Sequence, residues 1–138
     1  MLKPIFAANW KMNHGPTDGR AFVRSFLDQY PRTTDRTVAF FPPAITLAAV
    51  AESLRDRAEI LLGVQNVHHE PSGAFTGETS AGMARDAGAR LALVGHSERR
   101  HVFGETDEQT ARKVELVAKA GLAPVLCVGE TLDEREAG

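Results

Sequence analysis

Short apolar stretches alternate with helical patterns along this chain of 138 residues. Each stretch is too short for a helix and becomes polar at its carboxyl end, which is typical of buried strands in a parallel sheet. The expected strands start at Ile5 and then cover 37–41, 59–66, 91–94 and 122–128. The segments between them suit right-handed crossovers. The pattern predicts an α/β protein, which fits both a (β/α)₈ barrel and an open, doubly wound sheet.

The segments between the strands carry the periodicity of amphipathic helices. The apolar faces of the first two are Phe22, Val23, Phe26, Leu27 and Tyr30, and then Leu47, Val50, Ala51 and Leu54. Pro31 is expected to end the first helix, and Pro43 to stand early in the second. A short helix is predicted over 80–87. Capping boxes at Thr106–Gln109 and Thr131–Glu134 predict two further helix starts, the first of these helices ending at Gly121.

The most informative stretch is Val94-Gly95-His96-Ser97-Glu98-Arg99-Arg100, which follows the fourth expected strand. Gly95 permits a sharp turn. His96 then stands at the carboxyl end of a strand, where α/β proteins place their chemistry. Ser97 is expected to cap a short helix, with Glu98 in its first turn. The start of a helix beside the His96 ring favours the neutral imidazole, which can donate a hydrogen bond to a substrate oxygen. A histidine in a solvated turn fits this stretch equally well.

A second polar group, Asn9-Trp10-Lys11, ends the first strand. Asn9 and Lys11 lie two positions apart and therefore share one face, with Trp10 on the other. If the sheet closes into a barrel, both polar side chains can point at its mouth. The alternative is an exposed pair on an edge strand.

The segment 68–79 has no periodicity. A loop of this length in a compact unit is usually functional or an interaction loop. Phe75 stands near its tip, flanked by Thr76, and an exposed phenylalanine there indicates docking into a partner. A loop folded back on its own domain is the alternative. His68 and His69 have no cysteine or acidic cluster beside them to support a metal site.

Composition narrows the classes of function. The chain is 43% hydrophobic and 25% charged, as globular domains are, and its formal net charge of -2 argues against a nucleic-acid partner. No apolar stretch approaches the roughly 18 residues of a membrane span, and the amino terminus does not read as a signal peptide. The single cysteine, Cys127, excludes an intramolecular disulfide and is expected to be a small core residue. These features favour a cytoplasmic protein.

Three motifs occur in a specific order and spacing: Asn9-Trp10-Lys11, the stretch around His96, and Cys127-Val128-Gly129-Glu130. Together with Gly73-Ala74-Phe75-Thr76-Gly77-Glu78, they resemble triosephosphate isomerases over the whole chain. The resemblance implies a (β/α)₈ barrel that interconverts dihydroxyacetone phosphate and D-glyceraldehyde 3-phosphate through an enediolate. It further implies a role in glycolysis and gluconeogenesis in the cytoplasm, with no metal or organic cofactor. The expected small-molecule substrate agrees with the composition, which argues against nucleic acid and membrane as partners.

The same resemblance implies roles for individual residues. Asn9 and Lys11 match substrate-contact positions, and Lys11 would offset the negative charge of the phosphate and the enediolate. His96 matches the electrophile that polarises the substrate carbonyl and moves protons between the two oxygens. Glu98 matches a carboxylate that helps to order Lys11.

The resemblance also implies a homodimer that is formed through the long loop. Thr76 matches the loop-tip residue that reaches the first loop of the other subunit. A contact between subunits at this loop would also explain why Phe75, beside Thr76, is exposed.

A complete barrel needs about 250 residues, so residues 1–138 are expected to be a single, incomplete domain, the amino-terminal portion of a barrel. The family's catalytic glutamate, its lid and its phosphate loops would lie beyond residue 138, and Glu130 and Glu134 precede the sixth strand, so neither replaces that base. These 138 residues alone are therefore expected to be nearly inactive. The alternatives are a non-catalytic half-barrel that self-assembles through its edge strands and an open flavodoxin-like binding domain, for which no phosphate loop is present.

Overall fold

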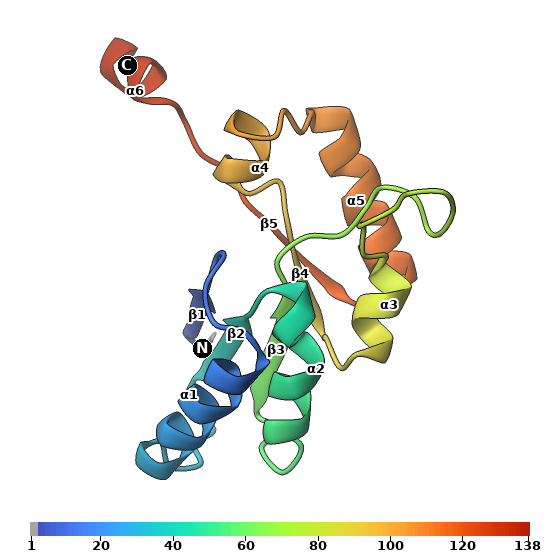
Figure 1. Cartoon of the computed structure of the whole chain (residues 1–138). Helices are drawn as coiled ribbons and strands as arrows, with labels where there is room; N and C mark the ends of the chain where they lie inside the picture. Colours follow the sequence, from blue (N-terminus) through green and yellow to red (C-terminus); the bar gives the residue numbers. More distant parts are fainter. Residues whose placement is uncertain (1–2) are drawn as a thin grey trace.

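The computed structural model describes residues 3–138, which form one five-stranded parallel sheet (Figure 1). The strands are β1 (Ile5–Asn9), β2 (Thr37–Phe41), β3 (Ile60–Val64), β4 (Leu91–Val94) and β5 (Ala123–Leu126). Neighbours in the sheet are also neighbours in the chain, and all pairs are parallel. A doubly wound sheet reverses its strand order at a switch point, and this sheet does not. The described residues are therefore a half-barrel, as one of the two predicted architectures requires.

The crossovers carry helices α1 (Pro16–Gln29), α2 (Ala44–Ser53), α3 (Ala81–Asp86) and α5 (Asp107–Lys119), and short helices α4 (Ser97–His101) and α6 (Leu132–Ala137) follow β4 and β5. Both predicted capping boxes form: Thr106 with Gln109 starts α5, and Thr131 with Glu134 starts α6. Among the helices of residues 3–138, none combines the length and apolar character that crossing a bilayer requires.

Some predicted boundaries were wrong by one or two residues. β3 ends before 65–66 and β5 before 127–128, because these residues leave the strand ladder for the loops at the carboxyl edge. Pro43 precedes α2 as its N-cap instead of standing inside it, since its ψ of 149° is extended and not helical. Likewise Ser80 caps α3 from outside, with its hydroxyl accepting a hydrogen bond from the Met83 N–H.

Apolar side chains cover both faces of the strands, which accounts for the continuous apolar runs in the sequence. The main core lies between the sheet and the helices and includes Val23, Phe40, Leu47, Val50, Val64, Val94 and Val117. Ala39, Phe41 and Leu93 form a smaller cluster on the other face, with Cys127 partly buried at its margin. Asn9 pairs with Phe41 in the register of β1 and β2. Its side chain therefore belongs to the same, helix-free face of the sheet.

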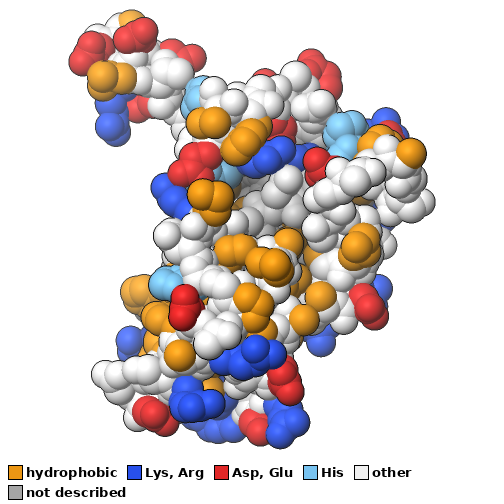
Figure 2. Space-filling view, in the orientation of Figure 1, with side chains coloured by type: hydrophobic (Ala, Val, Ile, Leu, Met, Phe, Trp, Pro, Cys, Tyr) orange, Lys and Arg blue, Asp and Glu red, His pale blue; other side chains and the backbone are white. Residues whose placement is uncertain are grey.

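Both edges of the sheet are open in the part of the chain that the structure describes. On β1, residues Ile5 and Phe6 are 68% and 56% exposed, and Leu126 on β5 is 51% exposed. An apolar groove of about 570 Å³ lies between β1 and the aromatic rings of Phe26 on α1 and Tyr30, which follows that helix. Figure 2 shows apolar side chains gathered on this side of the molecule. Such edges pair readily with other strands.

Candidate functional site

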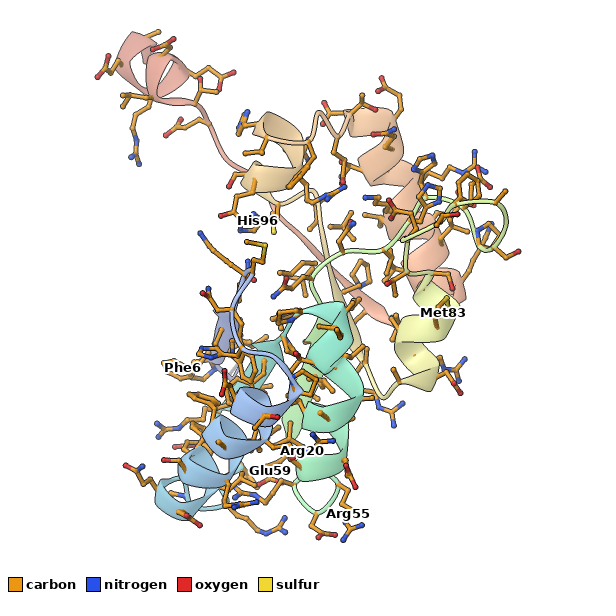
Figure 3. All side chains as sticks on the ribbon, in the orientation of Figure 1. Phe6, Arg20, Arg55, Glu59, Met83 and His96 are labelled. Carbon is orange, nitrogen blue, oxygen red and sulfur yellow. The ribbon has the colours of Figure 1, made fainter. Side chains whose placement is uncertain are left out.

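The carboxyl ends of the strands bring together polar side chains that are far apart in the sequence. In Figure 3, His96 lies beyond the end of β4 and faces the segment that follows β1. Asn9 Nδ2 is 3.4 Å from His96 Nε2, although 87 positions separate the two residues. Lys11 Nζ is 2.7 Å from Glu98 Oε1. The structure thus gathers the four site residues that the sequence singled out.

Asn9 and Lys11 reach this site because Trp10 faces the other way. The indole is buried, and its ring centroid lies 5.2 Å from that of Phe22 and 5.9 Å from that of Phe40. Its backbone N–H donates to the Phe41 carbonyl at 3.1 Å, which extends the pairing of β1 with β2 by one residue. Burial of the indole anchors the start of the loop and directs its polar neighbours away from the helices.

Gly95 makes the turn that places His96. Its φ of +69° lies in the left-handed region, which glycine enters without strain. A Cβ at this position would lie 2.9 Å from Thr110 Cγ2, so the turn also packs closely against α5. Arg100 Nε donates to the Gly95 carbonyl at 2.7 Å and fixes the turn from the other side.

The prediction that Ser97 caps the short helix was wrong, because His96 itself is the N-cap of α4. Its Nδ1 accepts a hydrogen bond from the Glu98 backbone N–H at 3.2 Å. Capping needs an acceptor that reaches the N–H two or three residues on, and the imidazole supplies one. A nitrogen that accepts in this way carries no hydrogen, so the neutral ring has its proton on Nε2.

His96 Nε2 and Asn9 Nδ2 are therefore two hydrogen-bond donors that face each other. The Asn9 amide is held in this orientation because its Oδ1 accepts the Lys11 backbone N–H at 2.9 Å. Two N–H donors that are 3.4 Å apart do not satisfy each other. A ligand oxygen lying beside both nitrogens would accept from both. Asn9 Nδ2 and His96 Nε2, called the donor pair below, thus form a small site of the type that stabilises developing negative charge on oxygen.

Lys11 and Glu98 supply the charges of the site. The hydrogen bond from the Lys11 ammonium, followed by its positive charge, lowers the pKa of Glu98 below its usual value. Both side chains are about half exposed, at 56% and 45%, so the ion pair contributes little to stability. Its effect is local: it holds a cation within reach of the donor pair.

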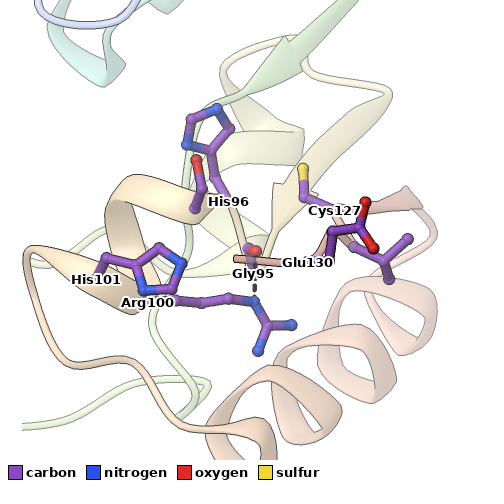
Figure 4. Close-up of a pocket in the computed structure, with 9 residues that line it drawn as sticks. Gly95, His96, Arg100, His101, Cys127 and Glu130 are labelled. Carbon is purple, nitrogen blue, oxygen red and sulfur yellow. Dashed lines mark hydrogen bonds between the residues drawn. The ribbon is translucent and has the colours of Figure 1, made fainter. Parts of the chain in front are cut away.

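Two hollows meet at His96. One, of about 230 Å³, is also lined by Asn9, Lys11 and Glu98. The other, of about 290 Å³, lies between the ends of β4 and β5 (Figure 4) and includes Cys127. Burial raises the pKa of the Cys127 thiol, which makes it a poor nucleophile.

The long loop lies apart from these residues, between β3 and α3, where Figure 1 shows it extending beside α5. Its base is closed by the His68 N–H, which donates to the Thr79 carbonyl at 2.9 Å. Phe75 is 41% exposed while its ring lies 4.2 Å from the ring of His68, so it packs on its own loop and still presents an edge to solvent. Thr76 is exposed at the tip. Residues 3–138 contain no group of three or more metal-ligating side chains placed to hold an ion.

Parallel strands in unbroken chain order, with polar groups converging at their carboxyl ends, define the class of (β/α)-barrel proteins with a site at that end of the sheet. Residues 4–138 match the family model described as triosephosphate isomerase, and the chain belongs to this family. It is 46% identical over 138 residues to the triosephosphate isomerase of Symbiobacterium thermophilum, which covers all of this chain and 54% of that protein. It is 46% identical over 138 residues to the triosephosphate isomerase of Carboxydothermus hydrogenoformans, and this match covers 100% of this chain and 55% of the relative. It is 40% identical over 137 residues to the triosephosphate isomerase of Aquifex aeolicus, and this match covers 99% of this chain and 55% of the relative. The chain spans about half the length of these curated relatives.

Proposed function

We propose that this chain supplies the amino-terminal half of a triosephosphate isomerase, which interconverts dihydroxyacetone phosphate and D-glyceraldehyde 3-phosphate in glycolysis and gluconeogenesis. The observation that carries the proposal is the donor pair of Asn9 and His96 beside the Lys11 cation. Membership of the family supports the choice of substrate. The proposed location is the cytoplasm, and the proposed reaction uses no metal or organic cofactor.

In the proposed reaction, the substrate carbonyl oxygen accepts from His96 Nε2 and Asn9 Nδ2. Negative charge grows on this oxygen as the enediolate forms, and both donors then bind it more strongly than they bind the carbonyl, which lowers the barrier. Lys11 offsets the charge of the phosphate and the enediolate. Because His96 is neutral and carries its proton on Nε2, it can also move a proton between the two substrate oxygens.

The reaction further needs a base that takes the carbon-bound proton. The carboxylates near the site are already engaged: Glu98 pairs with Lys11, and Glu130 pairs with Arg135 at 3.0 Å. Glu134 accepts hydrogen bonds from the Thr131 backbone N–H and hydroxyl. The resemblance to the family implies that the base of the proposed enzyme comes from the carboxyl-terminal part of the relatives, which lies outside the match to this chain.

The proposal is tested by joining residues 1–138 to the carboxyl-terminal part of the Symbiobacterium relative that follows the match. The chimera is expected to isomerise both triose phosphates. The chain alone, confirmed by intact mass at 14.9 kDa, is expected to show almost no turnover, because Glu98 and Glu130, the carboxylates of the described residues that line the two hollows at His96, are both paired. The carboxyl-terminal part alone is the control. A folded chimera without activity, or appreciable turnover by the chain alone, contradicts the proposal.

A non-catalytic half-barrel that self-assembles is the second candidate, and the exposed Ile5, Phe6 and Leu126 at the sheet edges favour it. Light scattering of the same chain-alone sample separates the two. A well-behaved monomer contradicts self-assembly.

The proposed enzyme is a homodimer whose subunits meet through Phe75 and Thr76. Thr76→Arg is expected to raise the dissociation constant of the chimera dimer about 100-fold or more, because an unpaired charge buried in the subunit contact costs about 3–5 kcal/mol. Sedimentation over a dilution series measures the constant. Ser25→Arg, which adds the same charge on the exposed surface of α1, is the control. An unchanged constant in the Thr76 variant argues against this contact.

A further inference from the structure

Lys11 has a backbone conformation that a lysine seldom adopts. Its φ is +55°, in the left-handed region, where the Cβ of an L-residue crowds the backbone. Non-glycine residues persist in this region when the surrounding structure holds them there. The Lys11 ammonium depends on this conformation, since the direction of the side chain follows from φ and ψ. The groups that hold the Lys11 backbone therefore also place its charge.

Hydrogen bonds fix the backbone of Lys11 on both sides. Its N–H donates to Asn9 Oδ1 at 2.9 Å, and its carbonyl accepts from Gln65 Nε2 at 2.8 Å. The second contact reaches across 54 positions of the chain, from the residue that directly follows β3. Rotation about the N–Cα bond of Lys11 into an ordinary conformation would swing its carbonyl away from Gln65 Nε2.

The Gln65 amide is itself rigidly held. Its Nε2 also donates to the Phe41 carbonyl at 2.8 Å, so the two hydrogens of the NH₂ group each have an acceptor. The same Phe41 carbonyl accepts the Trp10 N–H. Gln65 therefore ties the loop after β1 to the end of β2. A side chain of the same length without two donors cannot make this tie.

We infer that Gln65 is a positioning residue, whose side-chain amide selects the left-handed conformation of Lys11 and thereby directs the ammonium to Glu98 and the donor pair. Gln65 acts through Lys11 and needs no contact with the substrate. The kinetic consequence rests on the proposed function, whereas the conformational consequence does not.

The first test measures the conformation of Lys11 by NMR in the 138-residue chain. In the wild type, the intraresidue HN–Hα NOE and the three-bond coupling of Lys11 are expected to report a positive φ. In Gln65→Met, which keeps the length but has no donor, they are expected to shift to an extended or averaged conformation, with loss of the contact to Glu98. Gln65→Glu keeps the shape of the side chain but lacks the amide hydrogens, and it is expected to cause the same change in the conformation of Lys11. It provides a second variant if Gln65→Met does not fold. Gln29→Met removes an exposed glutamine of α1 and is the matched control.

The second test is a double-mutant cycle in the active chimera. Gln65→Met is expected to raise KM about 10-fold, because a displaced ammonium weakens binding of the phosphate, whose charge is the same in ground and transition states. A smaller decrease in kcat is expected from the weaker interaction of Lys11 with the developing enediolate. In the background Lys11→Met, the same change is expected to have almost no further effect. A purely structural role would lower activity equally in both backgrounds.

The two tests separate the inference from the proposed function. A positive φ and an intact Lys11–Glu98 contact in both Gln65 variants overturn the inference, whatever the activity. Additive kinetic effects in the cycle overturn it as well. A folded wild-type chimera without activity overturns the proposed function, and the NMR result then still decides whether Gln65 positions Lys11.

Discussion

Replacing His96 by glutamine in the chimera is expected to lower kcat about 100-fold or more. A glutamine side chain has an acceptor for the Glu98 N–H and an amide hydrogen for the substrate, so it can copy both hydrogen bonds of the imidazole. It cannot pass a proton between two oxygens, and general acid–base catalysis typically contributes 10²–10⁴-fold. The loss therefore measures proton transfer and not the shape of the site.

Steady-state kinetics in both directions measure this loss, with kcat and KM determined separately. We expect the change mainly in kcat, because the lost interaction exists only in the transition state. His101→Gln makes the same substitution four residues from the helix start, on an exposed side chain of α4, and is expected to leave turnover nearly unchanged. If His96→Gln stays within a few-fold of the parent, the electrophile assignment is wrong.

The fold could be predicted because each strand carries the same signal. Runs such as 37–41 are apolar on both faces, and the structure buries them between the helices and a second cluster around Phe41 and Leu93. Glycines and capping boxes marked the ends of the elements, and the capping boxes at Thr106 and Thr131 both formed. The sequence pattern left the closed and open sheets equally suitable, because strand order depends on long-range pairing that no local pattern encodes.

The candidate site was predictable as a set of residues, whereas its hydrogen bonds were not. Ser97 looked like the cap of α4 because hydroxyl side chains are preferred there, yet His96 reaches the Glu98 N–H first. Gln65 lies in the polar end of the third expected strand, and nothing in the sequence pattern singled it out as a site residue. Its partners, the carbonyls of Lys11 and Phe41, become apparent when β1, β2 and β3 are assembled. Local preference thus located the edge of the sheet that carries the candidate site, and tertiary packing decided which atoms meet.

One part of the structure near this edge depends on charges that are almost fully buried. Glu105 and Lys113 are 7% and 3% exposed, and Lys113 Nζ lies 2.6 Å from Glu105 Oε2. Lys113 also donates to Asn66 Oδ1 at 2.8 Å, and Arg99 Nε lies 3.2 Å from the same carboxylate oxygen. This network connects α4 and α5 with the loop after β3. Removing Lys113 takes away the closest cation of the buried Glu105 carboxylate and leaves it with Arg99, which is partly exposed.

Lys113→Met is expected to lower the free energy of unfolding by about 3–5 kcal/mol, the usual cost of breaking a buried ion pair from one side. Urea unfolding followed by circular dichroism measures the change. Lys119→Met makes the same substitution on the same helix, at the exposed ion pair with Glu115, and is expected to change stability little. Equal losses in the two variants would show that burial is not the cause.

The pH dependence of a second variant, Glu105→Gln, tests the electrostatic origin of this stability. Burial raises the pKa of Glu105, but the hydrogen bonds and charges of Lys113 and Arg99 outweigh it, and the net pKa lies below the usual value. A carboxyl group with a lower pKa in the folded state stabilises the fold above its unfolded pKa of about 4.3. That contribution disappears as the pH falls through the folded-state pKa. The stability difference between the wild type and Glu105→Gln is therefore expected to be full at pH 7 and to shrink on acidification below about pH 4, and a difference that stays constant with pH would contradict the charged pairing.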